Sequence, residues 1–242
     1  MRIEVYGSGS DGNSYGISDG TTTFILECGL PMKHFNKASG YGLAKASAVV
    51  TSHSHGDHSS AIAEMHRRGL TVYCTKETAE VYAIYGQYGV NIVKEKEPIK
   101  IGTFTLMPFP LKHNHTGTME PCECFGYLIY SSETKERLLF VTDTMYVKNQ
   151  FKNLNYIMLE VNYIKDNLHS EGYDFIDSRR VQTHMSLETA VDFLKHQDLS
   201  KVRRVIATHL SESRADADVI LKTLRRTTGR ACYIAEPGLV LE

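Results

Sequence analysis

A short stretch of the sequence, VVTSHSHGDHSSA at residues 49–61, carries a dense group of side chains that bind metal ions. His53, His55, Asp57 and His58 fall within six consecutive positions. Alternate residues of an extended chain point the same way, so both histidines of the His-x-His pair can bind one ion. A glycine then lets the backbone turn, and Asp57 and His58 can face a second ion. The stretch therefore predicts that one loop serves two metal ions.

Three more side chains of this kind stand where predicted strands end. His113 ends MPFPLKH, Asp143 ends LLFVTD and His209 ends VIATH. Active sites in layered folds gather at strand ends, where loops converge on a rigid scaffold. We expect His113 to complete the first site, His209 to complete the second, and Asp143 to bridge them. Such a centre holds its ions about 3.5–4 Å apart around a bridging hydroxide. Imidazole and carboxylate ligands favour zinc, with manganese or iron as alternatives.

The pattern of apolar residues places these side chains on interspersed strands and helices. Apolar runs bounded by turn residues predict strands at 2–10, 22–29, 46–53, 70–75, 101–113, 124–132, 137–144, 156–162 and 202–209. Helical periodicity and capping residues predict helices at 59–69, 76–89, 186–197 and 215–229. Strands mixed with helices in this way indicate a layered α/β or α+β fold.

Length and composition are those of an ordinary globular protein. The chain has 242 residues, enough for one large domain, and we expect residues 1–242 to form a single domain. The net charge of -1, from 27 basic and 28 acidic side chains, argues against binding long nucleic acid by charge alone. Only residues 195–230 are basic overall, which fits either a solvated helix face or a patch that attracts phosphate.

Three features of the sequence bear on where the protein works. The N-terminal MRIEVYGSGS lacks the apolar segment of a signal peptide, and no apolar run reaches the length of a membrane helix. The five cysteines are odd in number and scattered, which indicates a reduced, intracellular protein. We therefore expect a cytoplasmic protein with no membrane partner, located in the host cytoplasm if a phage encodes it.

The segment TSHSHGDH resembles the H-x-H-x-D-H motif of the metallo-β-lactamase superfamily, and the resemblance covers nearly the whole chain. It implies an α/β fold of the αββα sandwich type, with the metal site at one edge between the two sheets. It also implies two divalent metal ions, zinc first and manganese as the alternative. The implied ligands are His53, His55, Asp57, His58, His113, Asp143 and His209.

Other segments resemble particular branches of that superfamily. GSGSDGNSYGI and ILECGL are similar to WalJ/YycJ-like proteins, and LEVN followed by THMSLETA and ATHLSES resembles both that group and ribonuclease Z. In such phosphodiesterases, the residues matching Glu160 and His184 form a pair near the leaving group. A carboxylate bonded to an imidazole keeps it protonated, as a general acid or a phosphate ligand. The alternative is a core glutamate beside a helix-capping histidine.

A few positions outside the ligand set also bear on the site. Glu27 stands where the family usually has aspartate, and we expect it to orient a metal-binding histidine. Asn13, in the glycine- and serine-rich turn, is expected to satisfy backbone groups beneath the site. Asn114 replaces a common aspartate. His115 competes with His113 as the ligand, although the motif favours His113.

The resemblance implies a dinuclear metal-dependent phosphodiesterase in which a metal-bridged hydroxide attacks phosphorus, with Asp57, Glu160 and His184 as catalytic residues. The substrate would be a nucleotide or nucleic-acid phosphodiester. Phage anti-Pycsar phosphodiesterases, which open cyclic mononucleotides, resemble the chain in length and motif content. We therefore expect hydrolysis of 3',5'-cyclic nucleotides to nucleoside 5'-monophosphates. A WalJ/YycJ-like DNA exonuclease is the alternative, followed by thioester or lactam hydrolysis and by a redox or non-catalytic use of the fold.

Three tyrosines suggest how subunits could associate. Tyr82, Tyr85 and Tyr88 are spaced three residues apart in the helix predicted at 76–89. At that spacing they would share a helix face, which could pack in the core or pair two subunits. Because relatives of this type often pair, we expect a homodimer built on this face.

Overall fold

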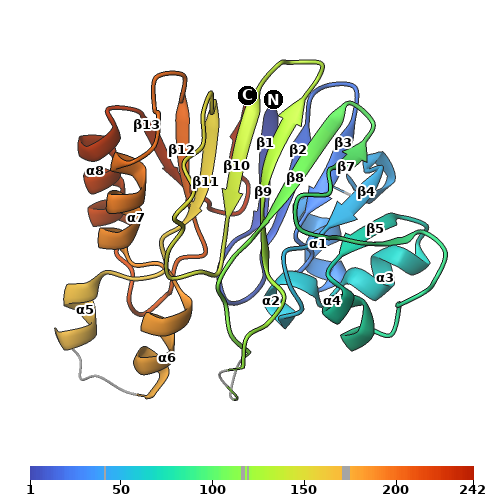
Figure 1. The fold of residues 1–242 in the computed structure, drawn as a ribbon, viewed down its shortest axis with the longest axis horizontal. Coiled ribbons are helices and arrows are strands. Elements are labelled where there is room, and N and C mark those ends of the chain that lie inside the picture. Colours follow the sequence, from blue (N-terminus) through green and yellow to red (C-terminus); the bar gives the residue numbers. More distant parts are fainter. Residues whose placement is uncertain (41, 116–117, 119, 171–174) are drawn as a thin grey trace.

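Two mixed β-sheets face each other across the centre of the molecule (Figure 1). The structure, a computed structural model, describes residues 1–40, 42–115, 118, 120–170 and 175–242. Within these residues each sheet has seven strands. The first contains, in spatial order, β14 (Val240–Leu241), β1 (Arg2–Gly7), β2 (Ser14–Ser18), β3 (Thr23–Leu26), β4 (Ala48–Val50), β5 (Thr71–Cys74) and β6 (Val90–Ile92). The second contains β13 (Ala231–Ile234), β12 (Arg204–Thr208), β11 (Tyr156–Glu160), β10 (Arg137–Val141), β9 (Phe125–Ser131), β8 (Phe104–Pro110) and β7 (Ile99–Ile101).

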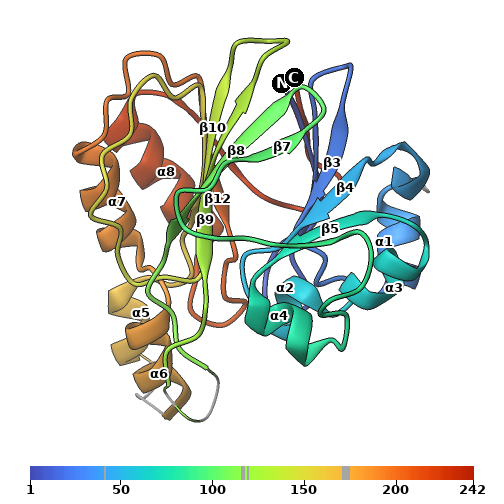
Figure 2. The ribbon, with the colours of Figure 1, turned by 45° about the vertical axis from the view of Figure 1, so that its right-hand side comes forward.

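Helices cover the outer faces of both sheets. The described helices are α1 (Met32–Ala38), the 3-10 helix η1 (Gly42–Lys45), α2 (Gly56–Ser59), α3 (Ile62–Arg67), α4 (Lys76–Val81), α5 (Lys165–Ser170), α6 (Phe175–Thr183), α7 (Leu187–Lys195) and α8 (Ala217–Thr228). α1, α3 and α4 lie beside the first sheet, and α7 and α8 beside the second (Figure 2). The layers run helix, sheet, sheet, helix, which confirms the predicted αββα sandwich.

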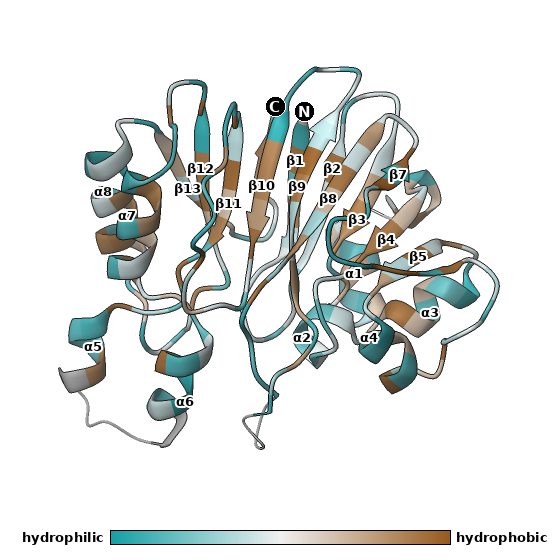
Figure 3. Cartoon of the chain, in the orientation of Figure 1, coloured by the Kyte–Doolittle hydropathy of each residue, from teal (hydrophilic) through white to brown (hydrophobic). Residues whose placement is uncertain are grey.

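Strand β11 shows why the sequence folds into these layers. Tyr156 and Met158 face the other sheet, whereas Ile157 and Leu159 pack beneath α7 and α8. Successive side chains of a strand point to opposite faces, so a strand buried on both faces is apolar at nearly every position. The hydrophobic colouring of the strands in the middle of both sheets follows from this rule (Figure 3).

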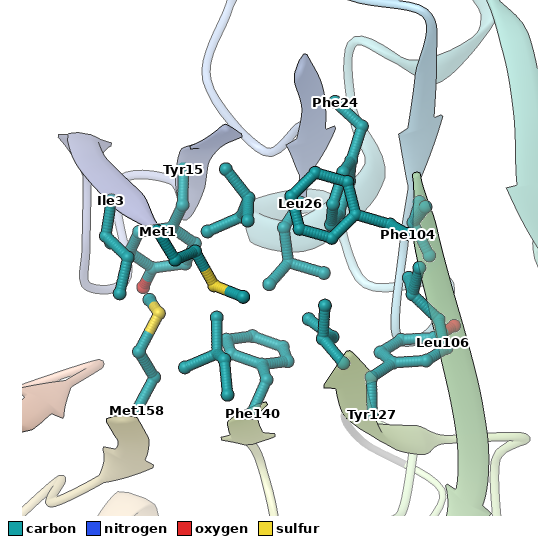
Figure 4. Packing of buried hydrophobic residues seen from close by; sticks show 14 of the residues in the cluster. Met1, Ile3, Tyr15, Phe24, Leu26, Phe104, Leu106, Tyr127, Phe140 and Met158 are labelled. Carbon is teal, nitrogen blue, oxygen red and sulfur yellow. The ribbon is translucent and has the colours of Figure 1, made fainter. Parts of the chain in front are cut away.

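Aromatic and aliphatic side chains together fill the space between the two sheets (Figure 4). The rings of Phe24 and Phe104 meet edge to face at 5.1 Å between centroids, and those of Tyr15 and Phe140 at 5.9 Å. Such pairs contribute about 0.5–1.5 kcal/mol each beyond the area that they bury. Each pair joins one sheet to the other, so the pairs fix the spacing of the two sheets.

Capping residues mark the starts of α7 and α8 and the end of α8 where the sequence predicts them. The hydroxyl of Ser186 accepts a hydrogen bond from the N–H of Thr189 at the start of α7. Asp216 caps α8 in the same way, and Gly229 ends that helix with a φ of 65°. Only glycine adopts this left-handed conformation freely, so the helix stops there.

The prediction of a helix at 76–89 is wrong for the residues after α4. Val81 is the last helical residue, because Ala83 has a φ of 54° and Gly86 a φ of 75°. The three tyrosines of this segment therefore do not share a helix face. Two other predicted elements are interrupted: 59–69 spans the end of α2 and a separate α3, and 101–113 contains a turn at Gly102 and ends as a strand at Pro110.

The strands with candidate ligands at their ends run to a common edge. β10, β11 and β12 are parallel neighbours, as are β4 and β5 in the first sheet. The connections beyond them lead toward the lower edge in Figure 1, where α2 and α6 lie. Within the described residues, every helix is too short or too polar to cross a bilayer.

Candidate metal centre

Asp143 is shared by two groups of potential metal ligands. Its Oδ2 atom lies 3.5 Å from Nε2 of His113 and 3.7 Å from Nε2 of His53. Its Oδ1 atom lies 3.3 Å from Nε2 of His58 and 3.8 Å from Nε2 of His209. In each group the ligand atoms lie within 4.8 Å of one another. The first group consists of His53, His55, His113 and Asp143, and the second group of Asp57, His58, Asp143 and His209. The structure brings together all seven predicted ligands, with one oxygen of Asp143 facing each group.

The loop after β4 and the short helix α2 supply four of the seven side chains. His53 is fully buried in the loop, and His55 is the N-cap residue of α2. Asp57 and His58 lie within that helix. Gly29 allows the neighbouring chain to approach, because a Cβ atom there would lie 1.8 Å from the carbonyl oxygen of Asp57. A side chain at position 29 would push α2 away from the site.

Three residues of the site have a left-handed backbone. Glu27 has a φ of 62°, Asp143 a φ of 41° and His209 a φ of 56°. Such a conformation costs roughly 1–3 kcal/mol for a residue with a side chain and tends to occur at functional sites. Here it turns each chain sharply at the end of its strand, so that the side chain points to the common centre.

Glu27 and Asn13 lie behind His58. Oε2 of Glu27 is 3.2 Å from Nδ1 of His58, and Oε1 accepts a hydrogen bond of 3.0 Å from the N–H of Ser52. The amide of Asn13 donates to the carbonyl of Asp57 at 3.2 Å and lies 3.2 Å from Nε2 of His58. Glu27 therefore joins the His58 ring to the loop that carries His53. Asn13 connects the glycine- and serine-rich turn to α2.

Glu160 and His184 form a pair beside the second group. Oε1 of the buried Glu160 lies 2.5 Å from Nδ1 of His184, and Oε2 accepts hydrogen bonds from the N–H groups of Thr144 (3.0 Å) and Met185 (3.2 Å). Burial acts to raise the pKa of Glu160, but the charge and hydrogen bond of His184 outweigh it and lower the pKa. The rings of His184 and His209 stack with centroids 5.3 Å apart.

The histidines of the first group are held neutral. Burial lowers the pKa of His53 well below its ordinary value, and repulsion from His58 adds to the effect. Burial, with His113 as the next cause, lowers the pKa of His55 to about 4. Burial also lowers the pKa of His113. Neutral imidazole is the form that binds a metal ion, so these side chains need lose no proton to bind one.

Two histidines of the second group have raised pKa values, in contrast to those of the first group. Burial opposes charge on His209, but Asp143 and the hydrogen bond to Asp57 overcome it and raise the pKa of His209 to about 10. The same two carboxylates raise the pKa of His58 well above its ordinary value despite burial. Two protonated imidazoles thus balance the carboxylates at this position. A divalent cation would supply the same positive charge and displace those protons.

The donor atoms fit metal ions. Nε2 of His53 and Nε2 of His55 are buried and have no hydrogen-bond partner among the described residues. A buried polar atom without a partner is rare and points to a missing ion or water. Imidazole nitrogens and carboxylate oxygens in this proportion suit zinc and other divalent transition metals. Together with the fold, this cluster implies divalent metal ions.

The competing candidate His115 belongs to neither group. Its Nε2 atom lies 3.3 Å from Oε1 of Glu77, and its side chain is 32% exposed. His113, in contrast, is buried, and its Nδ1 lies 3.2 Å from the carbonyl oxygen of Thr183. This geometry agrees with the motif in favouring His113. The neighbouring Asn114 lines the site cavity.

Side chains of the basic segment 195–230 have separate structural partners. Arg214 is buried and binds Asp177 at 2.8 Å. Arg203 forms an ion pair with Glu136, and Arg225 donates to the carbonyl of Cys232 at 3.2 Å. These three arginines therefore have structural partners, whereas Lys222 and Arg226 are exposed on α8.

An open cavity of about 200 Å³ gives access to the cluster. Its walls include six of the predicted site residues: His55, Asp57, His113, Asp143, His184 and His209. They also include Ser10 and Arg179, which the sequence analysis did not single out. A further unpredicted contact is that of Asn162, whose amide lies 3.0 Å from Nδ1 of His209. Asn162 is the last residue of the LEVN motif, so the motif could have indicated that it lies at the site. No sequence motif indicates that Arg179 does.

A model of the beta-lactamase superfamily domain matches residues 23–210. Zinc-bound PqqB from Methylobacterium extorquens is similar in structure, with a TM-score of 0.77, 15% identity and coverage of 100% of both chains. The short form of human tRNase Z has a TM-score of 0.66, 12% identity and coverage of 100% of this chain and 99% of that chain. A diphosphatase from the PhnP family has a TM-score of 0.66, 18% identity and coverage of 100% and 97%. No curated protein sequence matches significantly. Identities this low show likeness of fold alone.

Proposed function

Because the chain belongs to the beta-lactamase superfamily, we propose that it is a metal-dependent hydrolase that cleaves nucleotide phosphodiesters. The observation that carries the proposal is the position of the Glu160–His184 pair. Asp143, Glu160, His184 and His209 bring potential ligand atoms within 4.8 Å of one another, so the pair adjoins the metal centre. Phosphodiester hydrolysis needs positive charge for the phosphate oxygens and a proton for the leaving oxygen, and this edge provides for both. The names of two structural neighbours, a tRNase and a diphosphatase, support this reaction class.

Two divalent ions, zinc first and manganese second, would supply Lewis acidity and an activated water when bound. Zinc is bound by the neighbour PqqB. The first ion would be held by His53, His55, His113 and Asp143, and the second by Asp57, His58, His209 and Asp143.

The chain's own residues position the substrate and move the proton. Glu160 bonds to Nδ1 of His184, which leaves Nε2 as the ring nitrogen that can face the cavity. From there His184 donates a proton to the leaving oxygen or holds a phosphate oxygen. Asp57 lines the cavity and lies 3.0 Å from Nε2 of His209, so its carboxylate can also orient the attacking water.

The substrate within this class is proposed from charge, size and resemblance. The near-neutral charge and a cavity of about 200 Å³ favour a small nucleotide. Resemblance to the anti-Pycsar group puts 3',5'-cyclic mononucleotides first, with 5'-monophosphates as products. Resemblance to the WalJ/YycJ-like group makes a DNA end the second candidate. A redox or scaffolding role is less well supported, because the full set of ligand types is present.

A hydrolysis screen tests the proposal. Purified protein is loaded with zinc or manganese and offered cyclic mononucleotides, cyclic dinucleotides, and single- and double-stranded DNA. We expect turnover of at least one substrate, lost when metal is removed and in Asp143→Asn. His196→Ala, in which an exposed histidine outside the cavity is replaced, is the matched control. No hydrolysis of any phosphodiester with either metal would contradict the proposed function.

A further inference from the structure

A second cavity adjoins the site cavity beside His184. Its volume is about 170 Å³. The two cavities share Ser10, Arg179, Thr183, His184 and His209 as wall residues. Where the site cavity continues to the metal ligands His55 and His113, the second cavity is bounded by Asn162, Arg180 and Ser211. The second cavity therefore extends from the shared wall away from the first group of ligands.

The walls of the second cavity suit an anion. Within the described residues they contain two arginines, two histidines and hydroxyl or amide side chains, and no carboxylate. Nε of Arg179 is buried without a hydrogen-bond partner among the described residues, whereas Arg180 forms an ion pair with Asp177. The Arg179 side chain as a whole is only partly buried, so the cost falls on its Nε–H donor, and a ligand that supplies an acceptor there would stabilise this arrangement. Phosphate oxygens match a guanidinium in both charge and geometry.

The helix that carries Arg179 is fixed to the loop that carries Ser211. Asp177, in α6, accepts hydrogen bonds of 2.8 Å and 3.1 Å from the guanidinium of Arg214. Both side chains are buried, and the pair ties α6 to the segment between β12 and α8. Two walls of the cavity are thus held together before a ligand arrives, which limits the entropy lost on binding.

Size and position indicate which part of a substrate the second cavity receives. Each cavity is smaller than the 300–1,000 Å³ or so of common small-molecule sites, so a nucleotide ligand would occupy both. His184 lies in the wall common to both and, in the proposed function on which this inference rests, gives its proton to the leaving oxygen. The second cavity is therefore on the leaving-group side.

We propose that Arg179, Ser10 and Ser211 form a subsite for a phosphate carried by the leaving group. The hydrolysed substrate would then have two phosphates, one at the metal centre and one in the subsite. Water adds to the first phosphorus, the bond to the 3'-oxygen breaks, and that oxygen takes the proton. A cyclic mononucleotide has a single phosphate and supplies no acceptor to Nε of Arg179. Cyclic dinucleotides and nucleic-acid ends satisfy both positions. The subsite therefore ranks them above the cyclic mononucleotides, which resemblance and the site cavity alone put first.

A pair of dinucleotides tests the subsite. Thymidylyl-(3',5')-thymidine is compared with the same molecule bearing a 5'-phosphate, which places a second phosphate on the leaving nucleoside. In the wild type we expect kcat/KM to be about 10–100-fold higher for the phosphorylated dinucleotide, the usual worth of a charged hydrogen bond. Arg179→Gln should abolish this preference, and Arg179→Lys should keep part of it. Arg226→Gln, at an exposed position of α8, is the matched control and should keep all of it.

Several results would overturn the subsite. One is equal activity of the wild type on both dinucleotides. Another is an equal loss on both in Arg179→Gln, which would place the arginine on the scissile phosphate. If inorganic phosphate binds to the wild type but not to Arg179→Gln while the dinucleotides react alike, the ligand is the free ion and the leaving-group assignment fails.

A binding measurement separates this proposal from the proposed function. The two ligands are dinucleotides whose central linkage is a neutral methylphosphonate, one with and one without a 5'-phosphate. The 5'-phosphate is then the one charged group in the pair. Calorimetry should show about tenfold tighter binding of the 5'-phosphorylated analogue to the wild type and no difference in Arg179→Gln. If bis(4-nitrophenyl) phosphate and both dinucleotides resist hydrolysis, the proposed function fails, yet this difference still decides whether the subsite exists. Equal affinity of the two analogues for the wild type would remove it.

Discussion

Nδ1 of His184 lies 2.5 Å from Oε1 of Glu160, although 24 positions separate the two residues in the sequence. The carboxylate is fully buried at the end of β11, whereas the imidazole is 21% exposed and lines the site cavity. A buried acceptor thus fixes one ring nitrogen and leaves the other for a substrate. The His184 ring binds Glu160, and Ser186 caps α7 in its place. The backbone N–H of His184 donates to the carbonyl of Arg180 at the end of α6, so only the main chain of His184 takes part in a helix end.

The first prediction concerns proton donation by His184. His184→Ala should lower kcat for an alcohol leaving group, as in a nucleotide, by roughly 10²–10⁴, the usual worth of a positioned general acid. The loss should be much smaller for bis(4-nitrophenyl) phosphate, because a stable phenolate leaves without a proton. Steady-state kinetics on both substrates measure the difference. The metal content of His184→Ala should stay at the wild-type level. Equal losses of kcat on both substrates would instead mean that His184 binds a phosphate oxygen and donates no proton.

The ligands could be predicted from the sequence because they depend on local rules. Four of them come from one loop and one helical turn, so the motif around His53 and His58 nearly specifies their placement. The others follow strands, and parallel strands end at a common edge. The resemblance predicted that Glu27 orients a metal-binding histidine, but not which one. Its contact with His58 depends on the left-handed backbone of Glu27, which no side-chain pattern shows.

Two features escaped prediction for physical reasons. The tyrosine segment 76–89 has helical periodicity, but a left-handed Ala83 ends the helix, and tertiary packing overrides the local pattern. α6 is short and carries mainly hydrophilic residues (Figure 3), so it has no apolar stripe to mark it. The place of Arg179 beside the site could not be read from a helix that the pattern did not reveal.

The second prediction separates a shared ligand from an unshared one. Asp143→Asn should weaken both metal sites, because one oxygen of Asp143 faces each group. Asp57→Asn should weaken only the second, since Asp57 belongs to that group alone. Metal analysis after dialysis should give about two ions per chain for the wild type, about one for Asp57→Asn and fewer for Asp143→Asn. Activity should be lost in both, since two-metal chemistry needs both ions. One ion or none in the wild type at saturating metal would contradict a dinuclear centre.

The third prediction tests the glutamate behind His58. Glu27→Gln keeps an acceptor for the N–H of Ser52 but removes the charge that faces Nδ1 of His58. Metal affinity at the second site should fall by roughly 10–100-fold, as is usual for partners that orient a ligand. Titration of the metal-free protein measures the affinity. Glu77→Gln, beside His115, is the matched control and should bind metal like the wild type. Unchanged affinity in Glu27→Gln would leave Glu27 a purely structural role.

The fourth prediction is a homodimer, now based on exposure in place of a helix face. Tyr88 is 101% exposed and Tyr85 54%, and the nearby Val81 is 61% exposed. Such large apolar side chains close together are typical of an association surface. Light scattering should give about twice the 27.2 kDa of one chain. Replacing both tyrosines by serine should give a monomer. A wild-type monomer at micromolar concentration would contradict the prediction.

The last prediction compares two histidines that lie two positions apart. His113 is buried, its Nε2 lies 3.1 Å from Nδ1 of His55, and it belongs to the first ligand group. His115 pairs with Glu77 at the rim.

His113→Ala should therefore remove the first metal ion and abolish turnover, whereas His115→Ala should keep about two ions per chain and activity within about threefold of the wild type, as expected of a substitution outside the site. Metal analysis and kinetics on the same preparations measure both. Removing metal from the wild type should also lower its melting temperature, because ions that bind the folded state stabilise it. That shift should be nearly the same in His115→Ala and smaller in His113→Ala. The reverse pattern would move the ligand two places along the chain and show that the loop rearranges when metal binds.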